Sequence, residues 1–268
     1  MTPFTNILVP IDYSEPGDAA LRVAAHLARP VRGRLLVAHF LPPVYTMAEF
    51  PILPVETVVD AEILAENGLQ LADAASCERL VARALARFGR LDAAALFPTA
   101  AVGFTRGPLL EARLSDLQGM YGHFDSTFHL LRAVIPPMKA QGSGQVVVFT
   151  SAAGKRPEAG WSLYGAIRAG QSFLVQAAAL EHAADGICIN AVGSKNVVGP
   201  GFPLAPDGAI TEDHIERGAW SAPLEAETPL GRLGSNDELA AFCSVLLDGR
   251  SRFQTGQFYA YAGGWDVT

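Results

Sequence analysis

The sequence predicts an α/β fold in which one parallel sheet is doubly wound, with helices on both of its faces. Short apolar runs alternate with longer segments of helical periodicity along most of the 268 residues, which is the order of βαβ units. The run Val146–Phe149 is uninterrupted and rich in β-branched residues, as in strands buried on both faces. Half of the residues are hydrophobic, enough for the large core of a domain of this length.

The first half of the chain begins as a βαβ unit. Asn6–Ile11 and Leu35–Phe40 are apolar strands, and Ala19–Arg29 between them places leucine and alanine at helical spacing. Ala74–Phe88 is an amphipathic helix and Leu91–Phe97 is the next strand. We therefore expect a single Rossmann-like domain that spans residues 1–268.

The second half continues the same alternation. A long helical stretch should end at Pro136-Pro137, because proline lacks the backbone N–H that a helix needs. A further substrate loop, rich in proline and acidic residues, is expected at about 194–226 as a cap, with one helix around Glu212–Trp220. The other expected elements are the helices Leu109–Met138, Ser162–Ala184 and Asn236–Leu247, the strand Ile187–Val192, and a last strand that closes in Gly263-Gly264.

The turn after the first strand lacks the glycine-rich sequence that binds dinucleotides in such folds. It offers one glycine, and it carries the carboxylates of Asp12, Glu15 and Asp18. A pyrophosphate binds to bare backbone N–H groups at a helix N-terminus, and a like charge at ~4 Å costs on the order of 1 kcal/mol even in water. The sequence therefore predicts no NAD(P) and no other cofactor.

The composition of the chain limits the kinds of binding partner and the cellular compartment that we expect. The net charge of −7 argues against a nucleic-acid partner, which would need a basic face. The three cysteines form no CxxC pair, so neither a metal site nor a disulfide framework is predicted, and a cytoplasmic location is expected. No apolar run approaches the ~20 residues that span a bilayer, so no membrane partner is expected.

Ser151, Tyr164 and Arg168 are the candidate catalytic residues. Ser151 follows the buried strand, and Tyr164 comes 13 residues later on the next helix. Arg168 lies four residues beyond, on the same helix face. All three are expected at the carboxyl edge of the sheet, where α/β folds bind ligands. Tyrosine, with an ordinary pKa of about 10, is a poor base, and a neighbouring cation favours its phenolate.

This spacing resembles the short-chain dehydrogenase/reductase superfamily, whose members carry Ser, then Tyr, then Lys four residues after the Tyr. With Arg168 in place of the lysine, and Phe97-Pro98-Thr99-Ala100 where the superfamily has Asn-Asn-Ala-Gly, the chain is similar to the halohydrin dehalogenases. That branch has given up the nicotinamide cofactor. The resemblance implies a carbon–halide lyase: Tyr164, assisted by Arg168, takes the proton of a haloalcohol hydroxyl, and the alkoxide displaces the halide to form an epoxide. In reverse, a small anion opens an epoxide.

The same resemblance implies further site residues. In the dehalogenases the loop that follows the strand Ile187–Val192 frames a halide with backbone N–H groups and apolar or aromatic side chains. The alternative is that this loop is an ordinary substrate loop. His123 stands where the superfamily keeps a helix asparagine of its proton relay, although a local hydrogen bond is the other reading. The implied pocket consists of Tyr13, Ser194, Asn196, Val197 and Phe202.

Two other functions stay open. Residues 6–43 resemble the start of a universal stress protein, so a non-catalytic nucleotide-binding or stress-type protein is one alternative. The main alternative is an NAD(P)-dependent short-chain oxidoreductase with a degenerate cofactor site, in which Arg168 serves as the lysine. The resemblance also implies a homo-oligomer, a dimer or a tetramer, formed through Leu109–Met138 and Ser162–Ala184.

Overall fold

The computed structural model describes residues 6–11, 34–41, 61–67, 73–98, 106–198 and 221–267, the first three of these ranges by their backbone. A seven-stranded sheet has the order β3-β2-β1-β4-β5-β6-β9, and every neighbouring pair is parallel. This confirms the predicted Rossmann-like α/β fold. The strands are β1 Asn6–Ile11, β2 Arg34–Leu41, β3 Ala61–Asn67, β4 Ala93–Leu96, β5 Gly144–Ser151, β6 Ile187–Ser194 and β9 Phe258–Tyr261.

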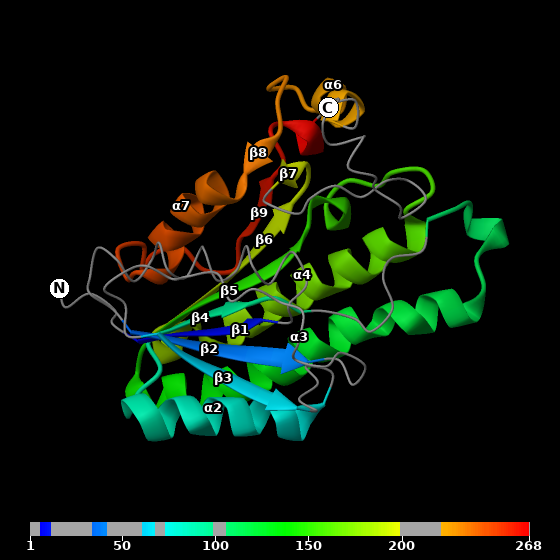
Figure 1. Cartoon of the computed structure of the whole chain (residues 1–268). Helices are drawn as coiled ribbons and strands as arrows, with labels where there is room; N and C mark the ends of the chain where they lie inside the picture. Colours follow the sequence, from blue (N-terminus) through cyan, green and yellow to red (C-terminus); the bar gives the residue numbers. More distant parts are fainter. Residues whose placement is uncertain are drawn as a thin grey trace.

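Helices cover both faces of the sheet (Figure 1). α2 (Ala74–Phe88), α3 (Leu114–Gln141) and α4 (Ser162–His182) lie on one face, and α7 (Asn236–Leu247) lies on the other. The shorter described elements are the 3-10 helices η2 Leu109–Glu111, η3 Ala152–Gly154, η4 Ala183–Asp185 and η5 Trp265–Val267, the helix α6 Ser221–Glu227, and the strand pair β7 Val197–Val198 and β8 Gly234–Ser235.

Alternation along the central strands explains why both faces are covered. Successive side chains of a strand point to opposite faces, and nearly every residue of β4, β5 and β6 is buried. One set packs against α2, α3 and α4, and the other packs against α7. The first set includes Ala94, Leu96, Val146, Val148, Ile189 and Ala191, and the second includes Ala93, Ala95, Val147, Phe149 and Val192.

The structure departs from the predicted elements at several places. The helix expected from Leu109 is instead the separate 3-10 helix Leu109–Glu111, followed by α3 from Leu114. α3 passes through Pro136 and Pro137 and ends at Gly142, whose φ of 69° is left-handed. The expected end at the prolines is wrong because Met138, which is fully buried, continues the packing of the helix on the core beyond them. β3 was not expected at all. The predicted helices Ala19–Arg29 and Glu212–Trp220 lie outside the described residues.

The strand order fixes where a ligand site is expected. β2 and β3 lie on one side of β1, whereas β4, β5, β6 and β9 lie on the other. The direction of winding therefore reverses between β1 and β4. In open α/β sheets ligands bind at such a switch point, beyond the carboxyl ends of the strands. The structure ends β5 at this edge with Ser151.

Candidate active site

Ser151 is the point where β5 turns into η3. Its Cα pairs in register with that of Ser194, the last residue of β6. The Ser151 Oγ accepts a hydrogen bond from the backbone N–H of Ala153 at 3.3 Å. This bond uses a lone pair of the oxygen and leaves the hydroxyl proton for an acceptor such as a substrate oxygen.

Close backbone packing sets α4 against this turn. A Cβ atom added to Gly154 would lie 2.7 Å from the backbone carbon of Arg168, and one added to Gly165 would lie 2.9 Å from the carbonyl oxygen of Ala153. Side chains at these two positions would therefore push η3 away from α4. The two glycines bring the end of β5 onto the first two turns of α4, where Tyr164 and Arg168 lie.

Three side chains surround the ring of Tyr164. The guanidinium carbon of Arg168 lies over the ring, 4.9 Å from its centroid. The rings of His123 and Trp161 lie at centroid distances of 6.3 and 5.5 Å, the first edge-on at 83°. Tyr164 itself is half-buried. The structure thus brings Tyr164 and Arg168 together as the spacing predicts.

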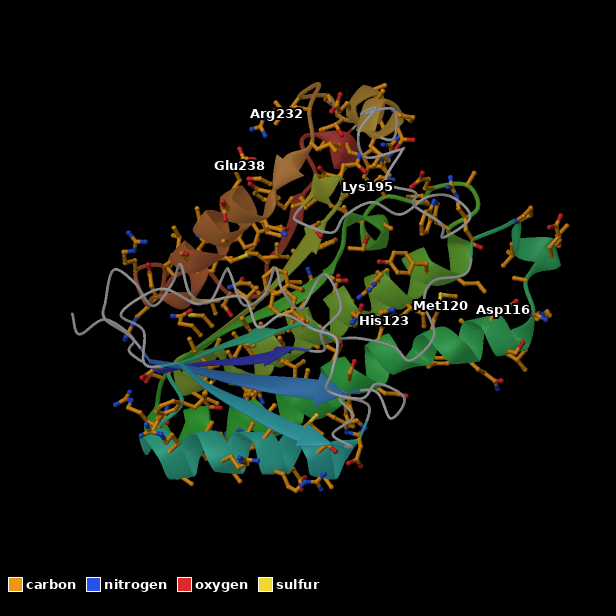
Figure 2. The ribbon with its side chains drawn as sticks, in the orientation of Figure 1. Asp116, Met120, His123, Lys195, Arg232 and Glu238 are labelled. Atoms are coloured by element: carbon orange, nitrogen blue, oxygen red, sulfur yellow. The ribbon has the colours of Figure 1, made fainter. Side chains whose placement is uncertain are left out.

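His123, on α3, faces the same site (Figure 2). Its Nδ1 lies 3.2 Å from the carbonyl oxygen of Pro98, and because a carbonyl only accepts, Nδ1 carries the proton. Burial first, and then the charge of Arg168, lower the pKa of His123 from 6.5 to about 4, although the bond to Pro98 acts in the opposite direction. His123 is therefore neutral at neutral pH, and its Nε2 lone pair is an acceptor.

Arg168 has one hydrogen-bonded nitrogen and one buried nitrogen without a partner. Its Nη1 donates to Oε1 of Gln171 at 2.9 Å. Its Nε is buried and has no hydrogen-bond partner among the described residues. Gln171 is completely buried and was not predicted as a site residue. The signal was present in the sequence, because a residue three positions after Arg168 shares its helix face.

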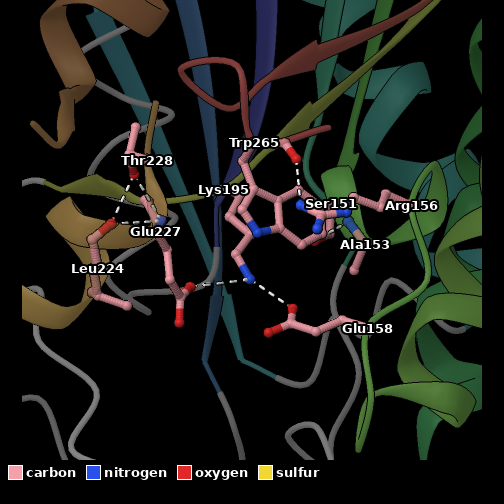
Figure 3. Close-up of polar contacts among 10 residues, drawn as sticks. Ser151, Ala153, Arg156, Glu158, Lys195, Leu224, Glu227, Thr228 and Trp265 are labelled. Carbon is pink, nitrogen blue, oxygen red and sulfur yellow. Dashed lines mark hydrogen bonds and ion pairs between the residues drawn. The ribbon is translucent and has the colours of Figure 1, made fainter. Parts of the chain in front are cut away.

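A second cluster closes the edge of the sheet beside Ser151 (Figure 3). Lys195, directly after β6, pairs with Glu158 at 2.6 Å, and its Nζ lies 4.1 Å from the ring centroid of Trp265. The guanidinium of Arg156 lies 4.6 Å from that centroid and donates to the carbonyl oxygen of Trp265 at 2.5 Å. Lys155 pairs with Asp266 at 2.7 Å. These contacts join the loop before α4 to the C-terminal η5, a link between distant segments that no local sequence pattern signals.

The predicted pocket residues are placed as follows. Ser194 lies at the end of β6 beside Ser151. Asn196 has a left-handed φ of 56°, and its Nδ2 donates to the Leu224 carbonyl oxygen at 3.2 Å and to Oγ1 of Thr228 at 3.0 Å. Val197 packs on the α7 side of the core. The remaining two, Tyr13 and Phe202, lie outside the described residues.

The described part of the site fits the catalytic end of a nicotinamide dinucleotide. The buried Nε of Arg168 is a donor that has no acceptor in the part of the chain that the structure describes, and ribose hydroxyl oxygens are acceptors of the right kind. Arg168 stands at the position of the lysine in the Ser-Tyr-Lys pattern of the resemblance described above, and both residues are cationic donors at neutral pH. The acidic turn Asp12–Asp18, which led us to expect no cofactor, lies outside the described residues.

Two protein families match the chain. Residues 56–266 match the family described as enoyl-(acyl carrier protein) reductase. Residues 3–87 match the universal stress protein family, which confirms the resemblance predicted for residues 6–43 and extends it. The two matches overlap over residues 56–87, at β3 and α2. The larger match contains Ser151, Tyr164 and Arg168 and every other candidate residue except Tyr13.

Individual relatives agree with the larger match. The putative oxidoreductase YtkK of Bacillus subtilis (strain 168) is 31% identical over 70% of this chain and 71% of its own length. The cyclohexanol dehydrogenase of Rhodococcus sp. (strain TK6) is 30% identical over 78% of this chain and 77% of its own length. Tropinone reductase homologues of Arabidopsis thaliana are matched over 53% to 61% of their length.

The solved structure of ElxO with NADP bound has the same fold. It superimposes with a TM-score of 0.80 over 99% of this chain and 100% of its own, at 19% identity. An identity this low supports the fold alone.

These findings contradict the predicted halohydrin dehalogenase. The matching family and the relatives are named as reductases, oxidoreductases and dehydrogenases, so the predicted cofactor-independent lyase, with its haloalcohol, epoxide and halide, is wrong. The prediction depended on Arg168 as the mark of a lost cofactor. Physically, an arginine supplies the same positive charge beside Tyr164 as a lysine does, so this one replacement does not distinguish the two chemistries.

No described helix is long and apolar enough to cross a membrane.

Proposed function

Since this chain belongs to the short-chain dehydrogenase/reductase superfamily, with residues 56–266 matching its enoyl-(acyl carrier protein) reductase family, we propose that it is an NAD(P)-dependent oxidoreductase. It interconverts a small carbonyl compound and the corresponding alcohol. The observation that carries the proposal is the guanidinium of Arg168 over the ring of Tyr164, at 4.9 Å, on the helix that packs against the turn after Ser151.

Each of the three residues has a role in this reaction. The Ser151 hydroxyl, whose lone pair is held by the Ala153 N–H, donates a hydrogen bond to the carbonyl oxygen of the substrate. Tyr164 gives its proton to that oxygen during reduction and takes it back during oxidation. Arg168 favours the phenolate that remains after the proton has left. His123, neutral at neutral pH, adds no second positive charge beside Tyr164.

The cofactor, when bound, supplies or accepts a hydride. Arg168 would hold its ribose hydroxyls, as argued from the unpartnered Nε. The phosphates would lie beyond β1, the position that the switch point of the sheet indicates. The matching reductase family and the relatives named as an oxidoreductase and a dehydrogenase support a hydride-transferring cofactor of this class for this chain.

We propose a ketone and its secondary alcohol as the substrate class, on the basis of the role of Tyr164 and of the name of one relative. A tyrosine that exchanges a proton with an alkoxide suits a ketone and a secondary alcohol. The name of the related cyclohexanol dehydrogenase supports a secondary alcohol here. The substrate loop predicted at about 194–226, together with Ser194, Asn196, Val197, Tyr13 and Phe202, remains a proposal for substrate contacts.

The test follows the absorbance of NADH and NADPH with the purified chain. The panel contains cyclohexanone, other small ketones and an enoyl thioester, and the reverse direction uses cyclohexanol with NAD and NADP. We expect turnover with at least one ketone. Tyr164→Phe should lower kcat at least ~100-fold, the loss typical of a missing general acid.

Tyr121→Phe is the matched control, because Tyr121 is an exposed tyrosine on α3. It should retain wild-type kcat. The proposal is wrong if no substrate of the panel oxidises the reduced cofactors, or if Tyr164→Phe turns over like the wild type.

We also propose a cytoplasmic homo-oligomer, with α3 and α4 as the contact surface. The support is the group of large apolar side chains that these two helices expose, which includes Phe128, Phe173 and Leu180. Light scattering coupled to size-exclusion chromatography should give a mass of two or four chains of 28.4 kDa. A monomer over the micromolar range would refute this part.

A further inference from the structure

Gln171 is a completely buried amide at the back of the active-site cation. Its side chain has four polar neighbours on three elements. Its Oε1 lies 2.9 Å from Nη1 of Arg168 and 3.4 Å from Oγ1 of Thr150. Its Nε2 lies 2.8 Å from the carbonyl oxygen of His123 and 2.6 Å from Oγ1 of Thr127. The amide therefore links α4 to α3 and to the end of β5.

The orientation of this amide is fixed by its partners. A guanidinium only donates, so the oxygen of Gln171 must face Arg168. The His123 carbonyl only accepts, so the nitrogen must face His123. The Thr127 hydroxyl donates to the same carbonyl at 2.8 Å, which leaves its lone pairs for the Gln171 N–H. Among the common side chains of this size, only glutamine supplies both an acceptor and a donor here.

This arrangement has a consequence for Arg168. A guanidinium is a planar fork, and its effect on a neighbour depends on how the plane is turned. With Nη1 bonded to Gln171, the guanidinium carbon lies 4.9 Å from the Tyr164 ring centroid. A lysine ammonium is a point charge on a flexible stem and has no such plane to hold.

We propose that Gln171 is a positioning residue, which acts through Arg168 by holding the guanidinium over Tyr164. The proposal deepens the proposed oxidoreductase function and rests on it. The proposal also explains why position 168 can carry an arginine. The side chain of Gln171 supplies the hydrogen-bond acceptor that orients the guanidinium.

The first experiment compares Gln171→Leu with Val175→Ala in the full-length chain. Val175 is also completely buried on α4, one turn further along, and belongs to the apolar core. We expect Gln171→Leu to lower kcat by about 10- to 100-fold, up to the loss that a misplacement of about 1 Å causes, with KM changed less than kcat. Val175→Ala should leave kcat unchanged although it loses core packing. Equal kcat losses in the two variants would mean that Gln171 is merely structural.

The second experiment asks whether Gln171 acts through the guanidinium. In an Arg168→Lys background the planar fork is gone, so adding Gln171→Leu should change kcat much less than it does in the wild type. A double-mutant cycle on kcat measures this coupling. Identical effects of Gln171→Leu in both backgrounds would overturn the proposal.

The third experiment needs no turnover and separates the two claims. Unfolding in urea is measured for Gln171→Leu, Arg168→Met and the double variant. If the two side chains are paired, the fold-change in the unfolding constant of the double variant should be smaller than the product of the single changes. If the wild type oxidises no reduced cofactor but this coupling is present, the proposed function fails while the pairing stands. Multiplicative effects would refute the pairing itself.

Discussion

His123 should make the protein less stable in mild acid, and the size of the effect follows from its surroundings. In the folded chain, burial and the nearby charge of Arg168 lower the pKa of His123 to about 4. In the unfolded chain the same imidazole has its ordinary pKa of about 6.5. Between these two values the unfolded chain binds a proton that the folded chain does not. Unfolding therefore takes up a proton, and the free energy of unfolding falls as the pH falls from about 6.5 to about 4.

The magnitude is at most about 3–4 kcal/mol. One pKa unit corresponds to about 1.4 kcal/mol, and the pKa of His123 is lower by about 2.5 in the folded state. Below pH 4 both states bind the proton, so this contribution does not grow further. Carboxylates also titrate near pH 4, so the contribution of His123 must be isolated by comparison with a variant that lacks it.

The assay is urea unfolding between pH 4 and pH 7.5 for the wild type, His123→Gln and His129→Gln. Glutamine at position 123 does not titrate but keeps a donor for the Pro98 carbonyl. His129 lies on the same helix, and its replacement is the matched control. We expect the free energy of unfolding of His123→Gln to fall less with decreasing pH than that of the wild type, and His129→Gln to follow the wild type. If the difference between the wild type and His123→Gln is constant over this range, His123 is not buried beside Arg168 as described.

Three further predictions concern packing, thiols and a helix cap. Gly154→Ala should lower the free energy of unfolding by about 1–3 kcal/mol and also reduce kcat, because the new methyl group meets the Arg168 backbone; wild-type values in urea unfolding and turnover would contradict this close approach. The three cysteines are buried, and burial raises the pKa of Cys77 to about 12. A thiol reagent should therefore label the native protein slowly and the unfolded protein at once. Rapid labelling of the native protein at neutral pH would be inconsistent with their burial. Ser235→Ala should cost about 1 kcal/mol in urea unfolding, because Ser235 and Glu238 form the capping box of α7; an unchanged unfolding midpoint would show that the cap contributes nothing.

Most of the fold was predictable because its signals are local. The apolar, β-branched run at Val146–Phe149 could only be a strand covered on both faces, and β5 is that strand. The periodicity of Ala74–Phe88 predicted α2 with both of its ends. β3 was missed because Ala61–Asn67 carries two glutamates and an asparagine, which are unfavourable in isolation. Its pairing with β2 is a tertiary contact that no local pattern contains.

The candidate site was predictable in part for the same reason. The spacing of Ser151, Tyr164 and Arg168 depends only on a strand end and one helix turn, and the structure brings Tyr164 and Arg168 together. The contacts of Gln171 and of Lys195 with distant segments could not be derived from spacing. The chemical conclusion drawn from Arg168 was wrong, because the charge of a side chain does not reveal whether a ribose lies beside it.

The central claim is that this chain transfers a hydride between a nicotinamide and a carbonyl carbon, with Tyr164 as the proton donor. The most direct test uses NADPH and NADH that carry deuterium at the transferred position of the nicotinamide, with the small ketones of the panel described above. Mass spectrometry and NMR of the product should find one deuterium on the carbon that bears the new hydroxyl, and Tyr164→Phe should form at least ~100-fold less of it. A product without deuterium, or the absence of any reduced product although the cofactor binds, would contradict the claim.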